Sequence, residues 1–329
     1  MLEPRLRGRL RPATPATFVN PVYPGYFADP YVVRHGDTYW AYGTGPSSDH
    51  DSRVFEILRS DDLVHWEPVG RALERLDIPG ATTYWAPEVV ADRGVLFLYY
   101  SVGDEDRGHV IRVATADRPE GPFLDSGQVL TPDEPFAIDA HPFRDVDGEW
   151  YLYYARDLLT GDRVGTSLAV DRLVDMTALA GDPRAVLTPT ADWQLFKRAR
   201  PMYGSVYDWH TLEGPFVVRR NGRYYCLYSG GAWTGAGYGV SWAVADDPLG
   251  PFSELRSDRA TLLRSVPGLA GPGHNSIVTG PDGEDYLVYH AWDSGHTGRR
   301  MCIDRVDWTA DGPRTLGPTA RPQPVPRAA

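Results

Sequence analysis

A pattern of glycine, two residues, an aromatic residue, two residues and tyrosine occurs five times along the 329-residue chain. Successive glycines of this pattern are 58, 54, 74 and 61 residues apart. A repeat at such a period indicates an architecture of similar units, so it constrains the fold more than any single local motif does. The five glycines are Gly36, Gly94, Gly148, Gly222 and Gly283.

Each repeat is predicted to begin with a β-hairpin. The glycine stands in a turn dipeptide, as in Asp147-Gly148, Asn221-Gly222 and Asp282-Gly283. These dipeptides supply the residues with positive φ that tight hairpins need. Apolar runs flank the turns, for example PYVV before Gly36 and YYCLY after Gly222.

A second signal follows the hairpins and completes the repeat unit. The segments ATADRPEGPF (114–123) and AVADDPLGPF (243–252) predict a third strand, a turn and an outer strand. Four strands per unit is typical of a propeller blade, so we predict an all-β, single-domain, five-bladed β-propeller over residues 18–318. The alternative is a β-sandwich; no helical period supports an α/β fold. Residues 1–17 and the tail 319–329 are expected to be poorly ordered.

Composition narrows the partners of the chain. Its formal net charge is −11, which does not favour binding to nucleic acid or to an anionic membrane surface. Since a single propeller can exist alone, we expect a monomer. The N-terminal segment has no apolar core of a secretory signal, so the expected location is cytoplasmic, or secreted if a leader was removed. Cys226 and Cys302 lie in apolar runs and are expected to be small buried residues.

Polar residues stand at similar places, just before the predicted first strand of each blade. Because these strands line the axis of a propeller, we expect their side chains to gather at one mouth of the central channel. A single acid beside proline is usually a turn residue, but five repeats are not explained in that way. The residues are Asp29, Glu88, Asp139 with His141, Glu213 and His274.

Such a group of carboxyl groups suits glycoside hydrolysis. Confinement separates the pKa values of like charges, which supplies an acid and a base in one pocket. Carboxyl groups on opposite sides of the axis would be widely separated, roughly 6.5–9.5 Å, which predicts inversion of the anomeric centre. Trp85, Trp209 and Trp233 are expected to stack on a sugar ring, with Glu88 and His141 as further binding residues.

Five motifs, in order, resemble those of glycoside hydrolase family 43. They are NPVYPGYFADPYVV, YWAPEVV, IDAHPFRDVDGEWYLYYA, LEGPFVVRRNGRYYCLYS and GPGHNSIVTGPDGEDYLVYHAWD. The resemblance spans residues 18–318 and implies a five-bladed propeller with an inverting mechanism.

The resemblance also implies a role for particular residues. Asp29 matches the general base of the family, Glu213 the general acid, and Asp139 the acid that tunes the pKa of the general acid and orients it. His274 matches a histidine that holds a calcium ion through water at the axis. Arg299 resembles an arginine of the substrate pocket, although the adjacent Arg300 also fits.

The family acts on α-L-arabinofuranosyl or β-D-xylopyranosyl linkages. A single propeller favours an exo-acting α-L-arabinofuranosidase on short oligosaccharides. A β-D-xylosidase and an endo-arabinanase are the alternatives within the fold, and a non-catalytic carbohydrate-binding propeller is the alternative of another class. The start typical of fructan-cleaving propellers is absent. Long loops near 190–210 and 230–238 are expected to close one end of a groove into a pocket.

Overall fold

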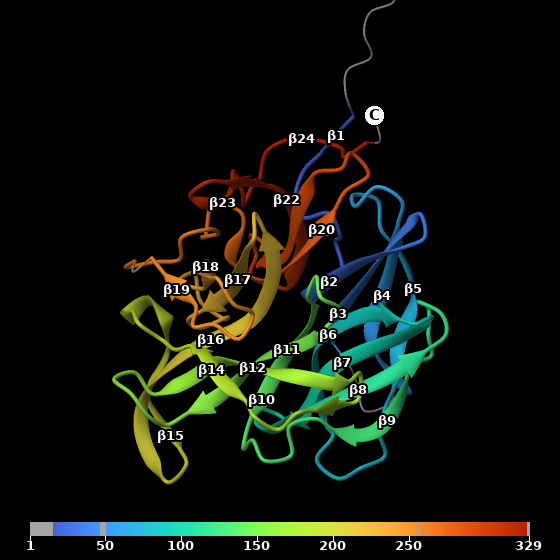
Figure 1. Cartoon of the computed structure of the whole chain (residues 1–329). Coiled ribbons are helices and arrows are strands. Elements are labelled where there is room, and N and C mark those ends of the chain that lie inside the picture. Colours follow the sequence, from blue (N-terminus) through green and yellow to red (C-terminus); the bar gives the residue numbers. More distant parts are fainter. Residues whose placement is uncertain (1–15, 47–50, 256, 328–329) are drawn as a thin grey trace, which may run out of the picture.

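The computed structural model describes residues 16–46, 51–255 and 257–327 of the chain. It is a five-bladed β-propeller, in which four-stranded sheets are arranged around a central axis (Figure 1). The innermost strands β2, β6, β10, β16 and β20 contact one another around this axis. Within the described residues, no helix is long and apolar enough to cross a bilayer.

The blades follow one another along the chain. Blade one holds β2 (Ala28–His35), β3 (Thr38–Thr44), β4 (Arg53–Ser60) and β5 (Glu67–Glu74). Blade two holds β6 (Thr83–Asp92), β7 (Val95–Asp104), β8 (Arg107–Ala116) and β9 (Leu124–Val129). Blade three holds β10 (Ala137–Arg144), β11 (Trp150–Leu158) and β12 (Gly165–Asp175), with β13 (Ala178–Leu179) and β14 (Arg184–Leu187) outside. Blade four holds β16 (Ser205–Arg220), β17 (Arg223–Gly230), β18 (Gly239–Ala245) and β19 (Ser253–Glu254). Blade five holds β20 (Ala270–Thr279), β21 (Asp285–Trp292), β22 (Arg299–Thr309) and β23 (Gly312–Thr315).

The repeat glycines lie in the turns between the first two strands of every blade. Their φ angles run from +64° at Gly36 to +92° at Gly148, a region that residues with a Cβ rarely adopt. The repeat tyrosines are buried between neighbouring blades; Tyr42 of blade one, for example, packs with Tyr84 and Tyr100 of blade two. The core therefore consists of layers between adjacent blades. Cys226 and Cys302 are free and buried in these layers, which confirms that expectation.

Residues 195–206 differ from the expected long loop. They form a hairpin of β15 (Leu195–Met202) and the beginning of β16, preceded by a 3₁₀ turn, η1 (Asp192–Gln194). Beyond this hairpin, β16 pairs in parallel with β12 at Gly165 and Thr166, which joins blades three and four into one sheet. The sequence feature that indicates this hairpin is the Tyr203-Gly204 dipeptide, which forms its turn and in which both residues have positive φ.

The two ends of the described chain meet at blade five. Strand β1 (Thr17–Phe18) pairs with β24 (Gln323–Pro324), and the Val22 N–H donates to the Met301 carbonyl of β22. The expected poor order is therefore wrong at Gln323–Pro324 of the tail and at Thr17 of the N-terminal segment, since these residues pair as strands. Of the other end, residues 1–15 lie outside the described residues.

Candidate active site

A β-bulge interrupts the inner strand of every blade at the same place. The strand register shifts between Ala28 and Tyr31 in blade one and between Ile138 and His141 in blade three, and the other blades repeat this irregularity. The bulged residues have left-handed backbones, with φ of 49° at Asp29, 61° at Asp139 and 49° at His274. Bulges redirect side chains, and strained residues of this kind are often found at functional sites.

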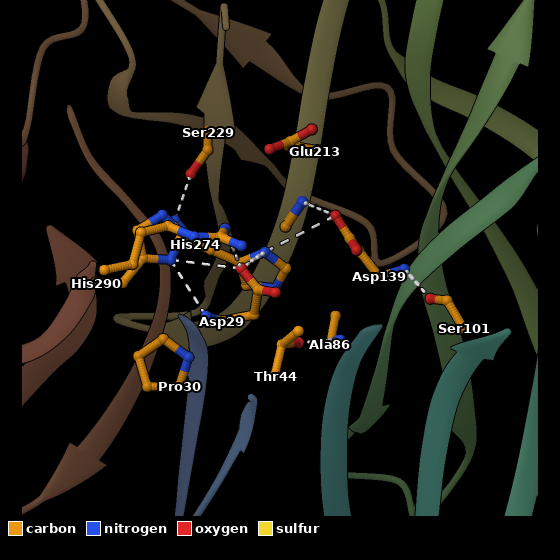
Figure 2. Close-up of polar contacts among 12 residues, drawn as sticks. Asp29, Pro30, Thr44, Ala86, Ser101, Asp139, Glu213, Ser229, His274 and His290 are labelled. Carbon is orange, nitrogen blue, oxygen red and sulfur yellow. Dashed lines mark hydrogen bonds and ion pairs between the residues drawn. The ribbon is translucent and has the colours of Figure 1, made fainter. Parts of the chain in front are cut away.

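The backbone amide of each bulged residue is held by a side chain (Figure 2). In four of the five blades, the acceptor belongs to the second strand of the preceding blade, with distances of 2.7–3.1 Å. The donor and acceptor pairs are Ala86 with Thr44, Asp139 with Ser101, His274 with Ser229, and Asp29 with His290. These bonds fix the residues of one blade to its neighbour.

Blade four differs from the other blades, because the acceptor of its bulge amide is not a residue of the second strand of blade three. The difference involves Glu213, the predicted general acid. Ser101, Ser229 and His290 each stand seven residues after their repeat glycine, where blade three has Ala155. An alanine offers no acceptor, and the Gly214 N–H donates instead to Oδ2 of Asp139 at 2.9 Å. Asp139 is thereby attached to the residue that directly follows Glu213.

Asp29 is a buried carboxylate surrounded by nitrogen groups. Its Oδ1 lies 3.3 Å from Nη1 of Arg299 and 3.4 Å from Nδ1 of both His274 and His290. Burial alone would raise the pKa of Asp29, but the charges of Arg299 and then His274 lower it well below its usual range. Asp29 is therefore ionised.

Glu213 has the opposite environment. Burial is the largest cause that raises its pKa, to about 7, and the neighbouring charge of Asp139 adds to it. The Tyr238 hydroxyl donates to Oε1 of Glu213 at 2.6 Å, which fixes the carboxyl group in place. The pKa of Asp139 is also raised, by burial and by the nearby charge of Asp29. Below about pH 7, one protonated and one ionised carboxyl group thus belong to the same site.

His274 lies between two of these acids. Its Nδ1 is 3.4 Å from Asp29 and 3.9 Å from Oδ2 of Asp139 (Figure 2). Burial would lower the pKa of His274, but the carboxylates around it, first that of Asp139, raise it above the usual value. The surrounding carboxylates therefore favour the protonated, positively charged form of this imidazole.

A pocket of about 470 Å³ opens above this group of residues. The carboxyl groups of Asp29, Asp139 and Glu213 line its base with His274, and Trp85, Trp233 and Arg299 line its walls. Of the two candidate arginines, Arg299 lines the pocket and Arg300 does not. Arg299 donates to Asp29 and to the Tyr26 hydroxyl and lies over the Trp233 ring at 4.5 Å, whereas Arg300 pairs with Asp293.

Three expected binding residues do not line this pocket. Glu88 and His141 lie below it in the channel, where they pair with each other at 2.7 Å, and His141 Nε2 also bonds the Val217 carbonyl. Trp209 is fully buried, and its indole N–H donates to Thr166. The bulge explains the error for Glu88 and His141, because it turns the residues that follow it down the channel. Trp209 belongs to the packing of β16 on β12.

Other residues of the site were missing from the sequence prediction. Tyr26 and Thr44 line the pocket, Tyr238 holds Glu213, and His290 accepts the Asp29 amide. Burial, with help from Arg299, lowers the pKa of His290 to about 4, so this ring is neutral. The seven-residue offset from the repeat glycines was the signal that points to His290.

The channel below the pocket does not fit direct chelation of a metal. Among the residues that the structure describes, no three His, Cys, Asp or Glu side chains come together as a metal site. Buried polar atoms without a partner occur near the catalytic residues in the chain and in space, namely the amide group of Asn275, which follows His274, and Nε2 of His290, whose Nδ1 accepts the Asp29 N–H. Such atoms suit ordered water, so only a hydrated ion is compatible with the residues present.

Comparisons with known proteins agree with this geometry. The family model described as glycosyl hydrolases family 43 matches residues 18–313. A beta-D-galactofuranosidase, xynD, of Aspergillus niger is 33% identical, over 89% of this chain and 83% of the relative. An extracellular exo-alpha-(1->5)-L-arabinofuranosidase of Streptomyces avermitilis is 28% identical over 93% of this chain, which spans 64% of that enzyme, less than two thirds.

A solved structure shows the same fold. The crystal structure of a thermostable family-43 glycoside hydrolase superimposes with a TM-score of 0.82 at 32% identity, covering 95% of this chain and all of the other. Family membership favours an enzyme over the alternative of a non-catalytic binding propeller. The chain belongs to glycosyl hydrolases family 43 and is a glycoside hydrolase of this inverting family.

Proposed function

We propose that the protein is an exo-acting α-L-arabinofuranosidase in which Asp29 is the general base and Glu213 the general acid. The observation that carries this proposal is the pair of opposite pKa shifts in one pocket: Asp29 is held ionised and Glu213 protonated. Inverting hydrolysis needs these two states at the same time. Asp139 acts as a positioning residue, because its carboxylate binds the Gly214 amide and raises the pKa of Glu213.

The reaction follows from these states. Asp29 takes a proton from a water molecule as the oxygen of that water attacks the anomeric carbon. Glu213 gives its proton to the glycosidic oxygen, so that the bond to the leaving alcohol breaks. Exchange with solvent then returns Asp29 to the ionised state and Glu213 to the protonated state. Arg299 keeps Asp29 ionised, and the rings of Trp85 and Trp233 offer apolar faces to the sugar.

Exo action is supported by the walls of the pocket. The segment between β17 and β18 places Trp233 over Arg299, and the Trp292 indole N–H donates to the Trp233 carbonyl. These contacts fix Trp233 as a wall on this side of the pocket, and such a wall suits a terminal sugar better than the middle of a chain. The Streptomyces relatives carry exo-arabinofuranosidase names.

A second candidate substrate is a β-D-galactofuranoside, which the name of the Aspergillus relative favours. The ring of β-D-galactofuranose has the configuration of α-L-arabinofuranose and differs by a longer exocyclic chain. The β-D-xylosidase alternative remains a candidate as well, since a relative from Bacteroides ovatus is a xylosidase/arabinosidase.

A panel of p-nitrophenyl glycosides tests the proposal. We expect wild-type protein to hydrolyse the α-L-arabinofuranoside with a higher kcat/KM than the β-D-xyloside or the β-D-galactofuranoside, and Asp29→Asn to abolish each activity. A preference for another sugar would replace the proposed substrate. Wild-type activity in Asp29→Asn would contradict the assignment of Asp29 as the general base. Linear arabinan checks the endo-arabinanase alternative, because an exo enzyme releases only arabinose.

We propose that calcium binds in the central channel as a hydrated ion beside His274. The partnerless Oδ1 of Asn275, the residue that follows His274, could accept a hydrogen bond from the water shell of such an ion. When bound, the ion would add positive charge below Asp29 and Asp139. Calcium is expected to raise the melting temperature and excess EDTA to lower it, whereas an unchanged melting temperature would contradict the proposal.

A monomeric state and a cytoplasmic location stay predictions; two Streptomyces relatives are named extracellular.

A further inference from the structure

A second pocket lies beside the active site. Its volume is about 630 Å³, and it lies between the β15–β16 hairpin and the segments around Arg107 and Phe136. The hairpin contributes Lys197, Arg200 and Tyr203. We call it the hairpin pocket. No described residue of the catalytic group lines it.

The hairpin pocket opens on the same face of the propeller as the active site. The segment between β7 and β8, the beginning of β10 and the hairpin all lie at the end where the inner strands start. A row of aromatic ring contacts, one stacked and one edge-to-face, joins the two pockets. Trp85 of the active site stacks on His109 at 3.8 Å, and His109 contacts Phe136 of the hairpin pocket at 5.7 Å.

Three of the four charged residues that line the hairpin pocket are cations, namely Arg107, Lys197 and Arg200, and the fourth is Asp106. Lys197 and Arg107 are exposed at its rim, and Arg200 lies partly buried in its wall. Asp106 is shared by Arg200, at 3.0 Å, and by Arg107, at 3.9 Å. Among the described residues, the Lys197 ammonium has no acidic group within 4 Å. A neutral sugar would not need these cations, whereas a carboxylate would be attracted to them.

The remaining walls suit a sugar ring. Phe136, Pro201 and Tyr203 present apolar surface to the pocket. Tyr203 is 42% exposed, and its hydroxyl donates to Oδ2 of Asp157 at 2.7 Å, which holds the ring in one position. A rigid aromatic face next to cationic groups recognises a ligand that has both an apolar ring face and a negative charge.

We propose that the hairpin pocket binds a uronic acid residue of the same oligosaccharide whose terminal sugar enters the active site. This inference rests on the proposed function, because it assigns an acidic substituent to the glycosidase's substrate. Phe136 and Tyr203 receive the ring, and Lys197 and Arg107 receive the carboxylate. The substrate class is therefore a branched acidic oligosaccharide that carries a uronic acid near its terminal arabinofuranosyl group.

The test compares two probes that differ in one carboxylate. The first is a short β-1,4-xylan fragment with one arabinofuranosyl and one glucuronosyl branch; the second is its carboxyl-reduced, neutral form. Binding is measured by calorimetry at low salt, on the Glu213→Gln variant, which prevents turnover. We expect the acidic probe to bind about fivefold more tightly, and Lys197→Gln to remove most of this preference. Arg93→Ala, on the opposite face, is the matched control and should keep it.

The single lysine of the chain gives a second measurement. Reductive ¹³C-methylation labels only Lys197 and the N-terminal amine, so a shift of the lysine signal reports the carboxylate directly. Equal affinity for both probes, or no shift of this signal with the acidic probe, would overturn the proposal. Wild-type hydrolysis of the p-nitrophenyl arabinofuranoside is measured beside it. If that activity is present while the preference is absent, the hairpin pocket alone has been misassigned.

Discussion

Asp29 and Glu213 show how neighbours decide the charge of a buried carboxyl group. Both lie in one pocket, yet Asp29 faces Arg299 and two imidazoles whereas Glu213 faces Asp139 and a tyrosine hydroxyl. Burial raises the pKa of both groups. The charges of Arg299 and His274 override this effect at Asp29, whereas the charge of Asp139 adds to it at Glu213, although the bond from the Tyr238 hydroxyl acts in the opposite direction. The motifs predict Asp29 as the base and Glu213 as the acid, and these roles stay predictions. The partners Tyr238 and His290 were not predictable, because they come from other strands.

The pH dependence of kcat/KM tests this arrangement. Glu213 must be protonated to act as an acid, so activity should fall as the pH rises through its pKa of about 7. In Asp139→Asn, the negative charge that raises this pKa is removed, while the amide oxygen still accepts the Gly214 N–H. The alkaline limb should therefore move to lower pH, by roughly one unit. An unmoved limb would show that Asp139 does not act on Glu213 electrostatically.

His290 is a positioning residue that can be tested separately. Its Nδ1 accepts the Asp29 N–H and so holds the left-handed backbone of the base. We expect His290→Ala to lower kcat by between about tenfold and about a hundredfold, with KM changed much less. Ser229→Ala removes the corresponding bond to His274 and gives a matched comparison within the same set of bulges. A wild-type kcat in His290→Ala, in folded protein, would contradict this role.

At the scale of elements, hairpins and bulges differ in how well the sequence predicts them. Turn glycines such as Gly148 and Gly222 mark the hairpins because only certain residues adopt positive φ easily. The bulges carry no such mark, since Asp29, Ala86 and His274 occupy left-handed conformations against their own preference. Contacts from the preceding blade impose these conformations. The pocket lining was therefore mispredicted for Glu88 and His141, which lie just beyond the bulges.

Gly165 tests the joint between blades three and four. It pairs with His210 where β12 meets β16, and a Cβ there would lie 1.8 Å from the His210 carbonyl oxygen. We expect Gly165→Ala to lower the free energy of unfolding by roughly 3 kcal/mol, measured by urea denaturation. Gly237→Ala is the control, because its Cβ would meet no atom within 4 Å. Equal stability of the two variants would mean that this joint does not depend on the close approach.

On the scale of the whole molecule, the number of blades was predictable because each blade repeats the same hairpin motif. The closure of the ring was not, because it depends on a segment with no repeat. Asn20 lies in this segment, and its side chain bonds both the N–H and the carbonyl of Ile303 in β22. Its amide also contacts Asp304, so the N-terminal segment is attached to blade five before it enters blade one.

Asn20→Ala should loosen this closure. The change leaves the Ile303 backbone groups buried without partners, which costs roughly 3 kcal/mol. We expect a melting temperature lower by roughly 5 °C in a thermal scan. Gln128→Ala, at an exposed position of β9, should leave the melting temperature unchanged. Equal melting temperatures of the two variants would mean that the bonds of Asn20 do not stabilise the closed ring.

The assignment of acid and base is tested most directly by leaving-group dependence. Glu213→Gln and Asp29→Asn are compared on 2,4-dinitrophenyl α-L-arabinofuranoside, whose leaving group needs no proton, and on α-1,5-arabinobiose, whose leaving group does. Glu213→Gln should remain within about tenfold of wild type on the aryl substrate and lose about a thousandfold on the disaccharide. Asp29→Asn should lose activity on both. A Glu213→Gln variant that is equally impaired on the two substrates, or fully active on arabinobiose, would contradict the account.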